Sequence, residues 1–582
     1  MYCICTAGHV NHGKTSLVKL LTGFDTDRLK EEKKRGLSIE LGFAKYSLNN
    51  KLYASIIDTP GHENFIRNMI SGAHAVDLVL MVVAANEGVK PQTIEHLNIL
   101  KLLSINEIVL VITKTDLVNQ KELLNLKNKL IGFFSENDFN NIDIIEVSNK
   151  NKIGIKNLEK AIFKKFNLVK KDSSQPARLS IDRVFSLEGK GTIVTGTLLG
   201  DKITKNSKLE IIPNYKEIRI KGLESFNKER LEVTPGSRTS INIQNLDTND
   251  VKRGEIIAEK NHIVESDFIY VNLKQIKNIK NSSEISFYTG TTKSVGTITK
   301  IKKSKIVKIK LRNKIPFLIG DKFIIRNNNG TVGGGEIVLY ERLKNESLLK
   351  NFILNDINKI SILLNEHKTL SLGKLQKYLG KNISGINKFL KNKKEFYLFE
   401  NDSYIIRTDD LKLDSKILYK NVLMYHKNFP LRKGIPLSNI NDKIEKNILI
   451  KTLQNNKLIK INEGFIQNYS FKSKPNKDQL VIIKEYFKRL DSNGFMPPTD
   501  KSLDIEIMNY LISENLIIKC SNNVFYLKKS YEQLKEKVLS LNNKFNQINI
   551  EILRDNLGLS RKYCLAILDK LEDNKIIRRN RV

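Results

Sequence analysis

The stretch "GHVNHGKTSL", residues 8–17, places two glycines, a lysine and a threonine close together near the start of the chain. Gly8 to Thr15 fit G-x-x-x-x-G-K-[ST], with a strand-like run before and a helix pattern after. Such glycines let successive backbone N–H groups face phosphate oxygens, and the helix adds its positive end. Lys14 would reach the β and γ phosphates, and Thr15 would bind Mg²⁺. The residues expected around the phosphates are Gly8, His9, Val10, Asn11, His12, Gly13, Lys14, Thr15 and Ser16.

The sequence around this loop predicts a doubly wound α/β domain over residues 1–170. Short apolar runs alternate with helical patterns at residues 2–8, 52–61, 76–88, 105–116 and 141–148. Buried runs of this kind indicate a mostly parallel sheet covered by helices. The ligand site of such a sheet lies at the carboxyl ends of its strands, where the chemical motifs of this chain fall.

Two further motifs follow strand ends. "DTPGH", residues 58–62, places Asp58 to hold the metal through water and the Gly61 N–H to contact the γ phosphate. "TKTD", residues 113–116, offers a carboxylate, Asp116, that accepts two hydrogen bonds from guanine but not from adenine. Three motifs in this order predict a GTPase with GTP and Mg²⁺ as its ligands.

The remaining residues of the base site flank that carboxylate. Lys114 is expected to pack along the base, and Ser148 to face its carbonyl oxygen. Thr113 departs from the Asn that is commonest at this position, which weakens local support for the loop.

"AGHVNHGKT" together with "DTPGHENF" resembles the translational GTPases of the elongation factor Tu class. The resemblance implies that His62 orients the attacking water, while Val10 and Leu37 form an apolar gate that restrains it. A surface turn is the alternative reading of His62. Asn11 departs from the Asp usual in the class, which is associated there with a bound monovalent cation.

Residues 25–43, "DTDRLKEEKKRGLSIELGF", resemble one branch of that class, the selenocysteine-specific elongation factors of SelB type. Ser38 takes the place of the switch threonine that binds Mg²⁺ in the GTP state, so the implied metal ligands are Thr15, Ser38 and Asp58. A solvated charged helix is the generic alternative for the first part of this stretch.

Helix periodicity vanishes after the polar linker at residues 170–179, and β-rich runs predict two β-barrel domains at 177–262 and 266–345. The resemblance places the aminoacyl end of a tRNA against the first barrel, at Asp182, Arg183 and Arg238. A selenol is anionic at neutral pH and a serine hydroxyl is not, so guanidinium groups could distinguish selenocysteinyl-tRNA from seryl-tRNA. Because neighbours on a regular strand face opposite ways, Asp182 and Arg183 can share a pocket only across a bulge. An ordinary barrel-surface arginine is the alternative.

The C-terminal part repeats a pattern of helices followed by two short strands. It predicts four winged helices, at 346–410, 411–474, 475–530 and 531–582. In the last, Gly558 marks a turn, Ser560 an N-cap, and Cys564, Ile567, Leu568 and Leu571 a core stripe. Arg561 and Lys562 occupy the first turn of the recognition-type helix, where they can address phosphates. The resemblance implies that this element binds an mRNA hairpin beside a UGA codon, with a solvated basic face as the alternative; the expected RNA-binding residues are Arg561, Lys562, Arg578, Arg579 and Arg581.

The bulk composition favours a polyanionic partner. The net charge is +35, of which residues 351–582, with 42 basic and 25 acidic residues, carry +17. Abundant Lys and Asn from an AT-rich coding sequence is the competing explanation. Four cysteines without metal-ligand spacing, and no run long enough to cross a membrane, favour a reduced, cytoplasmic protein.

The sequence thus predicts a multidomain GTPase: an α/β P-loop domain, two β-barrels and a tandem winged-helix arm. The resemblance implies a monomeric elongation factor that delivers selenocysteinyl-tRNA to the ribosome, which stimulates GTP hydrolysis, while the arm holds an mRNA hairpin. Two other functions stay open: a general aminoacyl-tRNA carrier, and a GTP-switched mRNA-binding regulator that delivers no tRNA.

Overall fold

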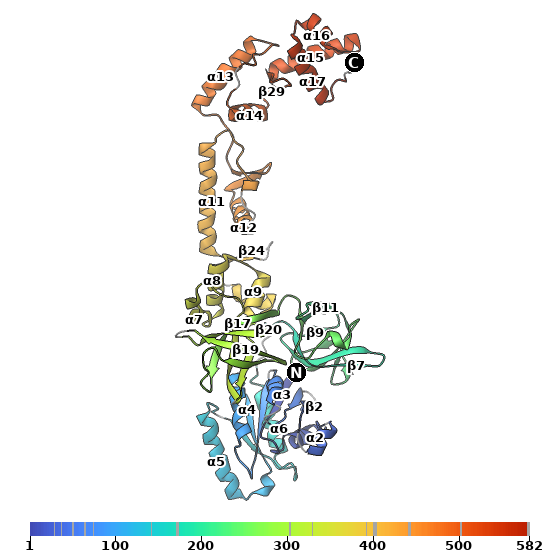
Figure 1. Cartoon of the computed structure of the whole chain (residues 1–582), viewed down its shortest axis with the longest axis vertical. Helices are drawn as coiled ribbons and strands as arrows, with labels where there is room; N and C mark the ends of the chain where they lie inside the picture. The colour runs from blue at the N-terminus through green and yellow to red at the C-terminus, as the bar shows by residue number, and fades with distance from the viewer. Residues whose placement is uncertain are drawn as a thin grey trace. The chain divides into compact units, whose positions relative to one another are not determined.

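The computed structural model falls into two compact units, Met1–Arg407 and Thr408–Val582, and each is described by itself (Figure 1). Among the helices of the described residues, none is long and apolar enough to span a bilayer. The structure describes residues 1–27, 29–35, 38–48, 52–62, 66–73, 75–140, 142–169, 174–301, 304–328, 330–391, 393–399, 404–439, 444–500 and 503–578.

The first domain is built on a sheet of β1 (Tyr2–Gly8), β2 (Gly42–Leu48), β3 (Leu52–Asp58), β4 (Leu78–Ala84), β5 (Ile108–Thr113) and β6 (Asp143–Glu146). The strand order is β2-β3-β1-β4-β5-β6, with only β2 antiparallel to its neighbour. Strands β2 and β3 lie on one side of β1, and those from β4 onward lie on its other side. The connections between strands therefore change direction beside the carboxyl end of β1. A doubly wound sheet binds its ligand at such a point.

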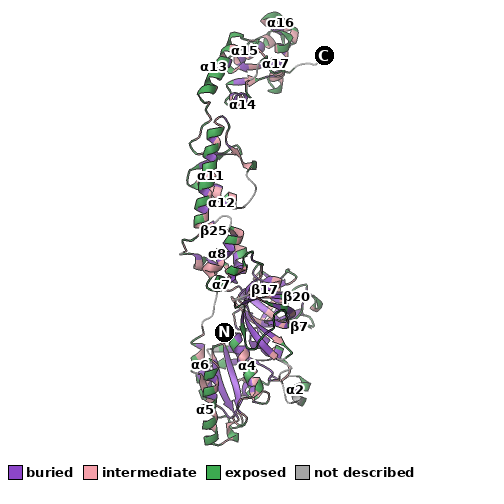
Figure 2. Ribbon diagram, turned by 60° about the vertical axis from the view of Figure 1, so that its left-hand side comes forward, coloured by how far each residue is buried: buried purple, intermediate pink, exposed green. Residues whose placement is uncertain are grey.

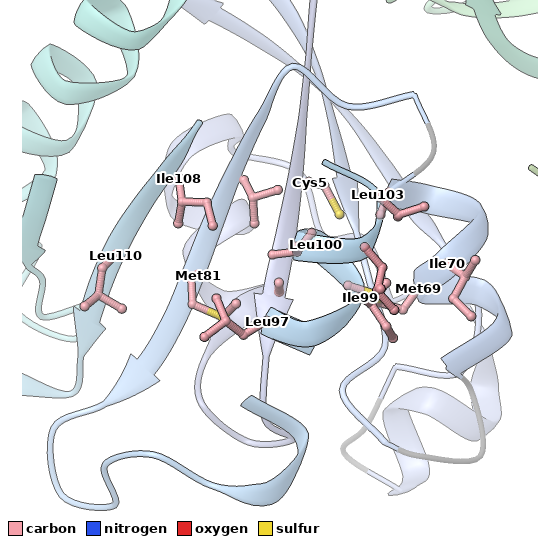
Figure 3. Close-up of a cluster of buried hydrophobic side chains, with 14 of the residues drawn as sticks. Cys5, Met69, Ile70, Met81, Leu97, Ile99, Leu100, Leu103, Ile108 and Leu110 are labelled. Atoms are coloured by element: carbon pink, nitrogen blue, oxygen red, sulfur yellow. The ribbon is translucent and has the colours of Figure 1, made fainter. Parts of the chain in front are cut away.

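Helices cover both faces of this sheet. One apolar cluster joins Met69, Leu97 and Phe134 to the strands, and a second joins Leu17 and Ile162 to the other face. Figure 3 shows part of the first cluster, with Leu97 and Leu100 beside the strands. The helices are α1 (Lys14–Thr22), α2 (Lys30–Arg35), α3 (Ile66–Ala73), α4 (Pro91–Leu102), α5 (Gln120–Glu136) and α6 (Ile155–Phe166).

The next domain contains an eight-stranded sheet, β11-β10-β16-β7-β8-β15-β12-β13, and the two-stranded sheet β14-β9 around one apolar core. Residues 170–173 of the polar linker before it lie outside the described residues. Its strands are β7 (Arg178–Leu187), β8 (Gly191–Leu199), β9 (Ile203–Thr204), β10 (Leu209–Ile212), β11 (Lys216–Ile218), β12 (Ile220–Ser225), β13 (Lys228–Glu229), β14 (Glu232–Val233), β15 (Arg238–Ile243) and β16 (Ile256–Glu259).

The third domain is a closed barrel of order β17-β20-β19-β18-β21-β22, filled by its inward apolar side chains. Figure 2 shows the buried residues concentrated in these strands and in the first sheet. The strands are β17 (Val264–Gln275), β18 (Glu284–Thr289), β19 (Thr292–Lys300), β20 (Ile306–Phe317), β21 (Lys322–Asn327) and β22 (Gly330–Leu339).

A small helical domain completes the first unit and shares a core with the barrel. Tyr270 and Leu339 of the barrel pack in one cluster with Phe352 and Leu363. Its elements are α7 (Leu349–Phe352), α8 (Asp356–His367), β23 (Thr369–Ser371), α9 (Leu372–Leu379), α10 (Ile383–Leu390), β24 (Phe396–Phe399) and β25 (Tyr404–Arg407).

The second unit repeats the arrangement of helices and a short hairpin, around three separate apolar clusters. The described residues end at 578, so part of the hairpin expected in the last repeat lies outside them. The elements are α11 (Thr408–Asn428), β26 (Ile435–Pro436), α12 (Ile444–Asn455), β27 (Ile459–Asn462), β28 (Phe465–Asn468), α13 (Lys477–Ser492), α14 (Ile505–Ser513), β29 (Ile517–Lys519), β30 (Phe525–Leu527), α15 (Lys528–Phe545), α16 (Ile550–Leu557) and α17 (Arg561–Asp573).

The predicted fold class is confirmed: a P-loop α/β domain, two β domains and a winged-helix arm follow one another along the chain. The second β domain is a closed barrel, and the first consists of an eight-stranded and a two-stranded sheet. The domain limits stay predictions.

Candidate functional site

The phosphate loop joins the end of β1 to the start of α1. Gly8 has φ +132°, and a side-chain carbon there would lie 2.2 Å from the Val82 carbonyl oxygen. Gly13, the N-cap of α1, has φ +84°, in the left-handed region that favours glycine. The loop can therefore run close over the sheet and present the N-terminus of α1 to an anion.

Lys14 is buried beneath this loop. Its Nζ donates to the carbonyl oxygens of Gly8, at 3.1 Å, and His9, at 2.8 Å. Burial lowers the pKa of Lys14 to about 8, against the opposing pull of Asp58. Gly61 lies so near that a side-chain carbon would be 2.4 Å from Lys14 Nζ and 2.7 Å from the Val10 nitrogen. A buried cation in a cradle that a Cβ would fill suits a phosphate group.

Two of the predicted metal ligands lie together. Thr15 Oγ1 is 3.0 Å from Ser38 Oγ, which in turn donates to Asp27 Oδ1 at 2.8 Å. Ligands of one octahedral Mg²⁺, each at about 2.1 Å, lie about 3 Å apart, so this pair fits the ion. Within the described residues no group of three or more His, Cys, Asp or Glu could hold a metal. Two hydroxyls would need water and phosphate oxygens to complete the shell.

Asp58, the third predicted metal ligand, is engaged by threonines. It accepts from Thr6 Oγ1 at 2.7 Å and from Thr26 Oγ1 at 2.8 Å. These two hydroxyls hold the carboxylate at the carboxyl end of β3, and its contact with a metal through water stays a prediction.

The base site forms at the end of β5. Ser148 Oγ donates to Asp116 Oδ1 at 2.6 Å, and this bond lowers the pKa of the carboxyl. Ser148 therefore contacts the carboxylate itself. The Thr113 hydroxyl donates to the His12 carbonyl at 2.6 Å, so it ties the base loop to the phosphate loop despite its departure from the usual Asn. Lys114 Nζ is paired with Glu87 at 3.2 Å.

A pocket of about 390 Å³ brings residues of the phosphate loop together with Ser38, Gly61 and Lys114, whereas Asp58, Asp116 and Ser148 are not among the residues that line it. Asp25, Asp27 and Lys19 also line it, and the motifs did not single them out. The signal that could have found Asp27 is its place before the switch serine in "DTDRLKEEKKRGLS". The lining residues are Val10, Asn11, Gly13, Lys14, Thr15, Ser16, Lys19, Asp25, Asp27, Ser38, Gly61 and Lys114.

The predicted catalytic group, His62, is half-buried in the turn after β3. It lies close enough to His9 to contribute, behind the larger effect of burial, to a lowered pKa of that histidine. Leu37, the second gate residue, lies outside the described residues, so the gate stays a prediction.

The three predicted aminoacyl-pocket residues meet where the first β domain contacts the GTPase domain. The pairing of β7 with β8 shifts register between Ile181 and Arg183, which is the bulge that a shared pocket requires. Arg238 donates to Asp182 through both terminal nitrogens, and its guanidinium lies 3.7 Å from the Phe43 ring centroid. Arg183 instead donates to Glu40 at 2.8 Å, so it contacts the segment that carries Ser38.

The predicted RNA-binding residues lie at the end of the second unit. Gly558 ends α16 with φ +62°, and the predicted stripe of α17 is fully buried. Ser560 is the N-cap of α17, as predicted, although its side chain accepts no capping hydrogen bond among the described contacts. Arg561 and Arg578 are exposed, and Lys562 Nζ donates to Thr499 Oγ1. Arg579 and Arg581 lie outside the described residues.

Comparison with known proteins identifies two segments by family. The family "Elongation factor Tu GTP binding domain" matches residues 1–167, and "Elongation factor SelB, winged helix" matches residues 540–581.

The similarity extends over the whole chain. A selenocysteine-specific elongation factor of Desulfomicrobium baculatum is 27% identical over 99% of this chain and 98% of its own length. The one of Haemophilus influenzae is 34% identical, over 60% of this chain and 58% of its own. The crystal structure of a bacterial selenocysteine-specific elongation factor, EF-Sec, superimposes with a TM-score of 0.72 at 25% identity, over 99% of this chain and 97% of that one. The first domain therefore matches the GTP-binding domain of elongation factor Tu, and the whole chain is similar to selenocysteine-specific elongation factors from its first domain to its last.

Proposed function

We propose that this protein is a GTP-dependent elongation factor that brings selenocysteinyl-tRNA to the ribosome at UGA codons marked by an mRNA hairpin. The observation that carries the proposal is the continuous likeness to a selenocysteine-specific elongation factor over 99% of the chain. A general tRNA carrier would need only the GTPase and barrel domains. Residues 540–581 match a SelB winged helix, which a factor that also holds an mRNA hairpin would use.

The GTPase domain would hold GTP with residues that are already in place. Asp116 offers two acceptor oxygens to guanine, and Ser148 fixes one of them at 2.6 Å. Lys14 and the N-terminus of α1 would neutralise the β and γ phosphates. A bound Mg²⁺ would neutralise phosphate charge, with the hydroxyls of Thr15 and Ser38 as protein ligands. His62 would orient the attacking water, and the ribosome would stimulate this step.

The aminoacyl group would be recognised by charge at the interface of β7 with the GTPase domain. Asp182 largely neutralises Arg238. The Arg183 side chain is 36% exposed; it forms an ion pair with an exposed carboxylate, Glu40, and donates to the Leu41 carbonyl at 3.1 Å. An exposed ion pair of this kind is weak. Arg183 is therefore the guanidinium better able to turn to a selenolate, and Asp182 with Arg238 would shape the pocket wall.

The winged-helix arm would hold the mRNA hairpin while the body carries the tRNA. Arg561, Lys562 and Arg578 lie on the described surface of the last winged helix, and Arg579 and Arg581 follow in the sequence. A factor that serves the ribosome in this way acts in the cytoplasm, as a monomer that meets two RNAs.

Binding of selenocysteinyl-tRNA and of seryl-tRNA to the GTP form tests the proposal. We expect strong preference for the selenocysteinyl form, and loss of that preference in Arg183→Gln. Arg312→Gln is a matched control, because Arg312 is an exposed arginine paired with a glutamate on the other β domain. Equal affinity of the unaltered protein for both tRNAs would favour the general carrier, and binding of neither would favour the mRNA-binding regulator.

A further inference from the structure

The first residue of the phosphate loop is held by a side chain from a distant part of the sequence. The Gly8 N–H donates to Nδ1 of His96 at 3.0 Å, across 88 positions of the chain. His96 lies in α4, and its side chain is fully buried. The imidazole is therefore part of the packing between α4 and the end of β1, at the first residue of the phosphate loop.

The bond fixes the protonation of the ring. Because Nδ1 accepts a hydrogen bond, it carries no proton, and the neutral ring must have its proton on Nε2. Burial, with the nearby Lys14 and His9, lowers the pKa of His96 to about 3. The surroundings thus favour the neutral form that can accept from Gly8.

Gly8 is constrained at both of its backbone polar groups. Its N–H is bound to His96, while its carbonyl oxygen accepts from Lys14 Nζ at 3.1 Å. Its backbone also lies so close to Val82 that even a methyl group would collide. The N–H belongs to the Ala7–Gly8 peptide and the carbonyl to the Gly8–His9 peptide, so the two bonds hold the peptide units on both sides of the Gly8 Cα. A displacement of Gly8 that breaks the bond to His96 would therefore also shift the carbonyl to which Lys14 donates.

We propose that His96 is a positioning residue of the nucleotide site, which holds the Gly8 peptide and thereby sets the Lys14 ammonium for the phosphates. His96 does not contact the nucleotide; it acts through the backbone of the loop. This inference rests on the proposed GTP site and adds a residue that lies outside all three GTPase motifs.

The competing account is that His96 only fills space under α4. Two substitutions separate these accounts. His96→Asn keeps an acceptor near the position of Nδ1 but loses apolar volume, whereas His96→Leu keeps the volume and removes the acceptor. If the hydrogen bond matters, the variant that keeps the acceptor, His96→Asn, binds nucleotide more tightly than His96→Leu. If only packing matters, the variant with the higher thermal stability binds more tightly.

The experiment measures the Kd of GTP and GDP for the full chain, beside thermal unfolding without nucleotide. We expect His96→Leu to raise both Kd values by about 10- to 100-fold, as for loss of a partner to a buried N–H. His96→Asn should recover most of this affinity even if it unfolds at a lower temperature than His96→Leu. His426→Leu is the matched control, because His426 also accepts a backbone N–H, from Asn468 at 3.1 Å, in the other unit. It should leave both Kd values unchanged.

Equal nucleotide affinity of the Asn and Leu variants would overturn the proposal, as would a Leu variant that binds like the unaltered protein. Should the variants not fold, nitrogen NMR of the unaltered protein with labelled histidine decides, since a protonated Nδ1 on His96 would exclude the bond. Failure of the unaltered protein to bind GTP at all would instead refute the proposed function.

Discussion

The chain contains two helix N-termini that face an expected anion, and they are built in opposite ways. At α1, the N-cap is Gly13 in a left-handed conformation, and the neighbouring cation, Lys14, is buried and bonded to backbone carbonyls. At α17, the N-cap is an extended Ser560, followed by Arg561 and Lys562 on the surface.

The difference between the two sites distinguishes selective recognition of one ligand from general electrostatic attraction of polyanions. A buried cation on a fixed backbone can satisfy only a ligand of one shape, and leaving it unpaired is costly. Exposed cations on long stems attract any polyanion, and salt screens them. Substitutions in the first site should therefore have large, specific effects, and those in the second small, salt-dependent ones.

The largest effect should come from Asp116→Asn. An amide supplies a donor where the carboxylate only accepts, so it matches the extra carbonyl of xanthine and opposes the amino group of guanine. We expect the ratio of XTP to GTP affinity to rise by about 10³-fold or more, since a mismatched polar pair can cost this much. Competition binding with GTP, XTP and ATP measures the ratio, and ATP binding should stay weak. An unchanged GTP preference would remove Asp116 from the base site.

His62→Ala should separate binding from hydrolysis within the same domain. GTP affinity should be nearly unchanged, because the role expected of His62, in the turn after β3, is to orient the attacking water and not to hold the nucleotide. Single-turnover hydrolysis with ribosomes should slow by about 10²-fold, as for loss of a positioned catalytic group. Equal rates for both proteins would leave His62 as a surface histidine.

The parts of the nucleotide site that were predictable are those whose geometry is local. Gly8 to Thr15 form one continuous loop, and their spacing alone sets the backbone that phosphate needs. The bulge beside Asp182 was predictable too, because two neighbouring residues cannot share a pocket without it, and the strand pairing shifts at that point.

Contacts across distant segments were not predictable. His96 meets Gly8 over 88 positions, and Thr26 meets Asp58 over 32. Each depends on how a helix or a loop packs on the sheet, which no motif records. Ser560 takes the N-cap position predicted for it, but its side chain makes no capping hydrogen bond, because residue type indicates a cap position and does not fix the rotamer.

The buried state of Lys14 predicts a smaller, pH-dependent effect. Burial lowers its pKa from 10.5 to about 8, so the nucleotide-free site loses this charge as the pH rises through that value. GTP affinity should be constant at lower pH and fall above it by up to about tenfold per pH unit.

Affinity measured from neutral to mildly alkaline pH checks this, with Lys14→Met as the control that should lose the dependence. The sign for stability is opposite. Between about 8 and 10.5 the unfolded chain binds more protons at this group than the folded one, so the group's contribution to stability rises with pH. A pH-independent affinity in the unaltered protein would contradict the assigned environment of Lys14.

The smallest effects are expected at α17, where they distinguish phosphate contact from base reading. Arg561→Ala and Lys562→Ala in the full chain should each weaken binding of an mRNA hairpin and make its salt dependence shallower by about one unit. Cognate and scrambled hairpins should be affected alike, since backbone contacts position an RNA without specifying it. Lys570→Ala, at the other end of the same helix, is the control and should change the slope little.

A loss of about 1–3 kcal/mol for the cognate hairpin alone would mean that the residue reads a loop base. If Arg561 is that residue, it would be selective for its ligand as the nucleotide site is. The contrast between the N-termini of α1 and α17 would then hold only for Lys562. If the unaltered chain binds neither hairpin at low salt, the arm is no RNA tether, and a protein-docking role becomes the better account.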